Sequence, residues 1–143
     1  MKNIVEQILP ILIEDNKKTI EKYYENKQYM AKPYFYYSMK TIELRLARGS
    51  GHSSAIANMA DPVNDLVVID TKNRYIYMEK FLKHGIKPIP MQDIINGKLQ
   101  AIKKDAFKRV FVDDAERTFN DFNKKEFYEY ISRFDIEIII LLG

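Results

Sequence analysis

Residues 41–60 read TIELRLARGSGHSSAIANMA. Apolar and polar side chains alternate over residues 41–46, which predicts a β-strand. The stretch Arg48-Gly49-Ser50-Gly51 is typical of a turn, and the small residues of 52–60 are compatible with a helix. The segment therefore predicts a strand, a glycine-rich turn and a helix in direct succession.

A glycine-rich turn that leaves a strand and opens a helix is suited to binding phosphate. Backbone N–H groups converge in such a loop, and the helix N-terminus adds about half a positive charge. Gly49 and Gly51 allow the backbone to approach an anion closely. Ser53 and Ser54 follow at positions where a hydroxyl could bind Mg²⁺. The plainer alternative is a tight turn of the same shape that binds nothing.

The rest of the core alternates between apolar runs and helical stretches. Amphipathic or polar helices are predicted at 74–84 and 124–134, a short strand is predicted at 86–89, and residues 91–107 carry no clear pattern. Continuous apolar runs predict buried strands at 66–70, 109–114 and 136–142. The sequence thus predicts an α/β fold with a parallel sheet of four or five strands, whose ligand lies beyond the carboxyl ends of the strands.

The chain of 143 residues is expected to be one domain, with an N-terminal helical segment at 1–38 and an α/β core at 39–143. A helix is predicted over 2–30, kinked or restarted at Pro10. Pro33 marks a break, and the aromatic run 34–37 follows it. We favour a packing wedge for this run; the alternative is a platform on which nucleic-acid bases stack.

Composition excludes several classes of function. There are no cysteines, which excludes a disulfide scaffold and a thiolate metal site, and two histidines are too few for a His-rich zinc site. Lys plus Arg is 23 and Asp plus Glu is 20, a net charge of +3 that permits nucleic-acid contact without arguing for it. No apolar run is long enough to span a membrane and no signal peptide is evident, so we expect a cytoplasmic protein.

The turn resembles the P-loop of NTPases, whose motif is G-x-x-x-x-G-K-[ST]. The corresponding window is Leu46-Ala47-Arg48-Gly49-Ser50-Gly51-His52-Ser53. Gly51 and Ser53 match the motif, whereas Leu46 replaces the first glycine and His52 replaces the lysine that neutralises the β- and γ-phosphates.

The strand at 109–114 resembles the acidic strand of the same ATPases, because it ends in Asp113 and Asp114. The resemblance implies that Asp113 serves Mg²⁺ together with Ser53, and that Asp114 or Glu116 orients the attacking water. The alternative for the paired acids is a structural cap at the end of the strand.

Among P-loop NTPases, the loop and the acidic strand are most similar to those of helicase and viral large-terminase ATPases. Some terminase ATPases carry the cation of the loop at an unusual position. Arg48 follows that spacing and could supply the missing charge, because an arginine is always charged and binds phosphate with two donors. The resemblance therefore implies binding of ATP or another nucleoside triphosphate with Mg²⁺, a phage-related origin and an association with nucleic acid. The residues implied to bind the nucleotide are Arg48, Gly49, Ser50, Gly51, His52, Ser53 and Ser54.

Other functions stay open at this point. A P-loop-shaped module without catalysis could bind a protein or a nucleic acid, and the missing lysine favours that alternative. The intact acids favour the ATPase. The chain ends on an apolar strand, so a partner that completes the strand, and hence an oligomer, is also compatible with the sequence.

Overall fold

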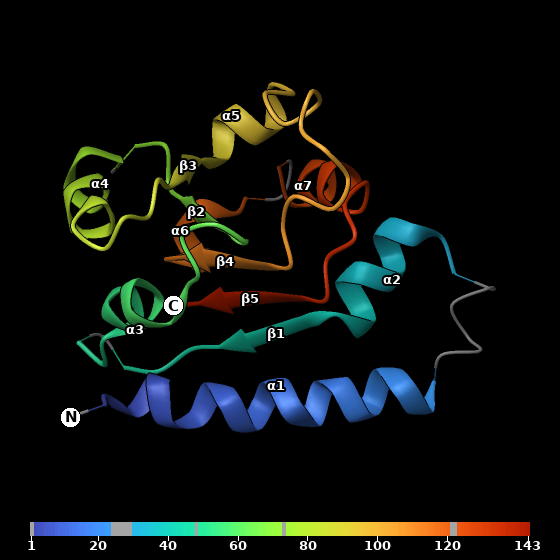
Figure 1. Ribbon diagram of the computed structural model, residues 1–143, viewed down its shortest axis with the longest axis horizontal. Coiled ribbons are helices and arrows are strands. Elements are labelled where there is room, and N and C mark those ends of the chain that lie inside the picture. The colour runs from blue at the N-terminus through green and yellow to red at the C-terminus, as the bar shows by residue number, and fades with distance from the viewer. Residues whose placement is uncertain (1, 24–29, 48, 73, 121–122) are drawn as a thin grey trace.

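The centre of the protein is a sheet of five parallel strands (Figure 1). The computed structural model describes residues 2–23, 30–47, 49–72, 74–120 and 123–143. Across the sheet the strands run β1 (Thr41–Leu44), β5 (Ile138–Leu142), β4 (Arg109–Asp113), β2 (Asp65–Ile69) and β3 (Ile89–Pro90). The predicted α/β class and all-parallel sheet are confirmed.

Helices cover both faces of the sheet, since side chains alternate between the faces along each strand. One core contains Val67, Phe111 and Ile140 and is covered by α1 (Ile4–Lys22), α3 (His52–Met59) and α4 (Arg74–Leu82). The other contains Val68, Val112 and Leu141 and is covered by α2 (Lys32–Met39), α5 (Met91–Ile95) and α7 (Asn123–Ile131). The short α6 (Ala115–Thr118) follows β4 directly.

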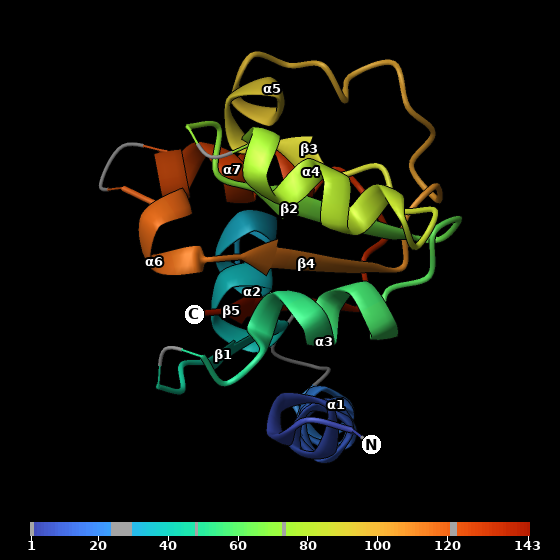
Figure 2. The ribbon, with the colours of Figure 1, turned by 90° about the vertical axis from the view of Figure 1, so that its left-hand side faces the viewer.

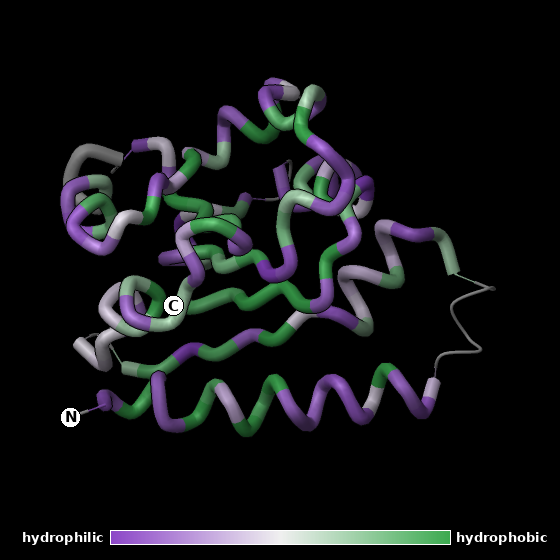
Figure 3. The backbone as a smooth tube through the Cα atoms, viewed as in Figure 1, coloured by the Kyte–Doolittle hydropathy of each residue, from purple (hydrophilic) through white to green (hydrophobic). Residues whose placement is uncertain are grey.

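The central strands are mostly apolar because both of their faces are buried. The polar residues of β2 and β4 lie at the strand ends, at Asp65, Arg109 and Asp113. Figure 3 shows β5 as an unbroken hydrophobic segment. β5 pairs with β1 on one side and with β4 on the other, so both of its edges are satisfied within the chain. None of the helices in the described part of the chain is long and apolar enough to cross a membrane.

The N-terminal segment differs from expectation in its details. α1 runs through Pro10 without interruption from Ile4 to Lys22, and residues 24–29 lie outside the described residues. Its start is fixed by Asn3, whose side chain accepts from the Glu6 N–H while the Glu6 carboxylate accepts from the Asn3 N–H. The capping box therefore sets the first turn of α1, at the end that approaches the glycine-rich loop.

The aromatic run 34–37 belongs to a helix rather than to a break. Pro33 lies in the first turn of α2, where a missing N–H costs nothing. Phe35 and Tyr36 are buried against the core, and the Tyr36 hydroxyl donates to the Phe134 carbonyl at 2.6 Å. The packing interpretation is confirmed for these two rings, which are not available for base stacking.

Candidate functional site

The glycine-rich loop connects β1 to α3 at the carboxyl edge of the sheet. Gly49 and Gly51 both have φ of +87°, a left-handed conformation that favours glycine. Gly51 is the N-cap of α3, and its carbonyl accepts from the Ala55 N–H at 2.9 Å. The first N–H groups of a helix have no partner within the helix, which is the arrangement that binds anions at helix N-termini.

α1 supports this loop through Asn3, a residue that no sequence motif marks. The Asn3 Nδ2 donates to the Gly51 carbonyl at 3.0 Å. A Cβ atom on Gly51 would lie 2.6 Å from the same Nδ2, so only glycine fits here. Glu6 extends the support, because its carboxylate accepts from the Asn58 side chain on α3.

Ser53 and Asp113 are in direct contact. The Ser53 hydroxyl lies 2.9 Å from Asp113 Oδ1 and 2.8 Å from Oδ2, although the two residues are 60 positions apart in the chain. Asp113 is 2% exposed. Burial raises the pKa of Asp113, the Ser53 hydrogen bond opposes that shift, and Asp114 adds to it. The contact brings together the two residues that the sequence assigned to Mg²⁺.

The two other acids lie beside them. Among the described residues, Asp114 is the only non-glycine residue with a positive φ (48°). This is a strained conformation of the kind found at functional sites. Its carboxylate lies 3.9 Å from Arg117, and the Glu116 carboxylate lies 2.8 Å from Arg45. The Glu116 N–H donates to the Gly143 carbonyl at 3.0 Å, which fixes α6 to the end of β5.

These groups line one open cavity of about 570 Å³. Figure 2 shows its surroundings: the loop before α3, the end of β5 and α6 lie along one side of the molecule. Gly49, Gly51, His52 and Ser53 contribute from the loop side, and Asp113, Asp114 and Glu116 contribute from the acidic side. The structure therefore gathers most of the predicted site into one place.

His52 does not act as a cation here. Its Nε2 accepts from the Leu46 N–H at 3.2 Å, which requires a lone pair on that nitrogen. Burial lowers the pKa of His52, against the opposing effect of Asp114. The residue that the resemblance aligns with the P-loop lysine is therefore a ring that accepts a hydrogen bond from the loop backbone.

The remaining predicted residues differ in their surroundings. The Ser50 hydroxyl donates to the Ala47 carbonyl at 2.5 Å, inside the loop itself. The Ser54 hydroxyl accepts from Lys80 Nζ at 2.9 Å. Arg48 lies outside the described residues, so its proposed role stays a prediction.

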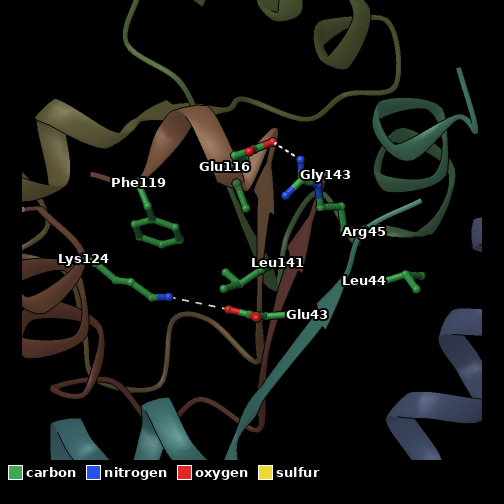
Figure 4. Close-up of a pocket in the computed structure, with 9 residues that line it drawn as sticks. Glu43, Leu44, Arg45, Glu116, Phe119, Lys124, Leu141 and Gly143 are labelled. Atoms are coloured by element: carbon green, nitrogen blue, oxygen red, sulfur yellow. Dashed lines mark ion pairs between the residues drawn. The ribbon is translucent and has the colours of Figure 1, made fainter. Parts of the chain in front are cut away.

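A second groove of about 250 Å³ adjoins the cavity (Figure 4). Arg45, Glu116 and Gly143 line both, and the Arg45–Glu116 ion pair stands between them. Phe119 and Leu141 give the groove an apolar wall, and Lys124 faces Glu43 across it at 3.5 Å. The loop site is therefore extended by a partly apolar surface.

Comparison with known proteins adds no assignment. No protein-family model, curated protein or solved structure matches this chain. The function is therefore argued from the site alone.

Proposed function

We propose that this protein binds a nucleoside triphosphate together with Mg²⁺ at the carboxyl edge of its sheet, in the manner of a P-loop NTPase. The observation that carries the proposal is the contact between Ser53 and Asp113. In P-loop NTPases, Mg²⁺ is held by the loop Ser or Thr and by an Asp at the end of a second, acidic strand of the same sheet. The two residues were selected from separate motifs, and they meet in three dimensions.

The donor set fits Mg²⁺ bound together with a substrate. Mg²⁺ prefers oxygen ligands and is usually held by one or two carboxylates plus substrate phosphates. The Ser53 hydroxyl and the Asp113 carboxylate are such ligands. Burial disfavours the charged form of Asp113 and so raises its pKa, and a bound cation would favour that charged form. No cluster of three or more His, Cys, Asp and Glu side chains that could hold a metal occurs among the described residues.

The chemistry that the site supports is hydrolysis of the terminal phosphate. Water attacks the γ-phosphorus as the bond to the bridging oxygen breaks, the proton of the water passes to a phosphate oxygen, and the nucleoside diphosphate and phosphate leave. Mg²⁺ would neutralise charge on the phosphate oxygens. The amides of residues 49 and 51–53 would bind phosphate, whereas the Ser50 N–H donates to the Ala47 carbonyl at 3.1 Å. Asp114 or Glu116, which line the cavity, would orient the water.

A second candidate, an interaction module without nucleotide, is favoured by His52. Its hydrogen bond to Leu46 and its lowered pKa leave the lysine position uncharged. Such a module would present the cavity edge to a protein or nucleic acid. Its distinguishing property is the absence of ATP binding.

Calorimetric titration with ATP tests the proposal. We expect the wild-type protein to bind ATP in the presence of Mg²⁺ and to lose most of the affinity in EDTA. Ser53→Ala should weaken Mg²⁺-dependent binding about 10-fold, the effect of losing one hydrogen-bonding or metal-binding group next to a charge. Ser38→Ala is the matched control, because that hydroxyl donates to Tyr34 on α2, remote from the cavity. A wild-type protein that gives no heat at millimolar ATP and Mg²⁺ contradicts the proposal and favours the interaction module.

A further inference from the structure

A triphosphate site needs a fixed positive charge, and the loop supplies none that the structure describes. His52 is neutral, and Arg48 lies outside the described residues. Backbone amides and a helix N-terminus contribute partial charges only. A full cation from elsewhere in the fold would complete the site.

Three described cations line the cavity, and two of them are already engaged. Arg45 is paired with Glu116 at 2.8 Å, and Arg117 is paired with Asp114 at 3.9 Å. Lys80 is the third, and its Nζ donates to the neutral Ser54 hydroxyl at 2.9 Å. Among the residues that the structure describes, Lys80 forms no ion pair. Its ammonium therefore keeps donors for an anion.

Lys80 is an exposed residue of α4 whose side chain reaches α3. α4 lies beside α3 on the same face of the sheet, as Figures 1 and 2 both show. The Lys80 side chain reaches from α4 to Ser54 in the first turn of α3, one residue from Ser53. The charge of Lys80 also acts on the carboxylate of Asp113, where it opposes the larger effect of burial, which raises the pKa of Asp113. Lys80 thus lies at the wall of the cavity where the phosphates of the proposed nucleotide would be bound.

We infer that Lys80 binds the phosphate oxygens of the nucleotide, so that a lysine from α4 replaces the lysine missing from the loop. The inference rests on the proposed function and deepens it. A lysine suits this role because its ammonium is a compact charge on a flexible stem, and Ser54 holds it close to the helix N-terminus. The hydrogen bond to Ser54 leaves the remaining donors of the ammonium for phosphate oxygens.

Replacement of Lys80 tests the inference by calorimetry with ATP and Mg²⁺. Lys80→Met keeps much of the aliphatic stem and removes the charge, and we expect the Kd to rise about 10- to 100-fold, as for one hydrogen bond to a charged group. Lys80→Arg, which keeps the charge, should recover part of the lost affinity. Lys83→Met is the matched control, because Lys83 is exposed just after α4 and does not line the cavity. Thermal denaturation of each variant verifies the fold.

The outcomes separate the inference from the function on which it rests. Wild-type affinity in Lys80→Met overturns the inference and leaves the proposed function intact. An equal loss in Lys80→Met and Lys83→Met also overturns it, because the effect would then be one of overall charge. A wild-type protein that does not bind ATP overturns both, and this is seen before any variant is compared.

Discussion

Asp113→Asn should abolish Mg²⁺-dependent hydrolysis of ATP while the protein stays folded. Asp113 is the buried carboxylate that contacts Ser53, and Asn offers a weaker, uncharged ligand in nearly the same shape. We expect turnover to fall about 100-fold or more, the usual effect of removing one preorganised electrostatic partner. Phosphate release measured with and without Mg²⁺ gives the result. Asp135→Asn, at an exposed carboxylate 3.6 Å from Lys104, is the control.

The same substitution should not lower stability at neutral pH. Burial raises the pKa of Asp113 in the folded state above its ordinary value. The contribution of Asp113 to stability is therefore present below the unfolded pKa and is lost as the pH rises through the folded pKa. Asn does not ionise. The Tm of Asp113→Asn minus the Tm of wild type should therefore be higher at pH 7 than at pH 4. A variant that unfolds at pH 7 would show that Asp113 serves the fold rather than the site.

Phe111→Ala should lower the free energy of unfolding by about 3–5 kcal/mol, the range for deleting a buried aromatic ring. Phe111 is 0% exposed on the central strand β4, within the core that α1, α3 and α4 cover. This loss is a large share of the roughly 5–15 kcal/mol typical of a domain. Urea denaturation measures it, with the exposed Tyr34→Ala as a control that should change little.

Phe111 also reports on the site. Side chains two positions apart on a strand share a face, so Phe111 and Asp113 both point toward the α3 side of the sheet. That register is what brings Asp113 to Ser53. A loss below about 1 kcal/mol would fall outside the range for a buried ring. It would contradict this placement of β4, and with it the placement of Asp113.

Much of the sheet could be predicted because its strands are nearly free of polar residues. The runs at 66–70, 109–114 and 136–142 correspond to β2, β4 and β5 within about two residues. Periodicity does not encode which strands are neighbours, so the insertion of β5 between β1 and β4 could not be read from it. The short strand expected at 86–89 is found at Ile89–Pro90, on the edge of the sheet where proline is tolerated.

The helical segments are less predictable than the strands because their local sequence signals fit more than one structure. Pro33 predicts a break in the sequence, but proline is equally suited to the first turn of a helix, and α2 begins around it. β1 ends at Leu44, two residues before the alternating pattern does, because the chain leaves the sheet to form the loop. Residues 91–107, which showed no clear pattern, contain the five-residue α5 followed by turns.

The candidate site was predictable where it depended on motifs and not where it depended on packing. Ser53, Asp113 and the glycines follow from the strand-turn-helix pattern and the acidic strand, and they meet at one edge. Asn3 and Lys80 carry no motif, because their roles arise only when α1 and α4 pack beside α3. The neutral state of His52 likewise depends on the Leu46 N–H, which folding brings to its ring.

A crystal structure of the protein grown with a non-hydrolysable ATP analogue and MgCl₂ tests the central claim most directly. The account predicts density for the triphosphate against the amides of residues 51–53, with a metal ion beside the Ser53 hydroxyl and the Asp113 carboxylate. A loop without an anion, its amides bonded to protein groups while Ser53 still donates to Asp113, would contradict it.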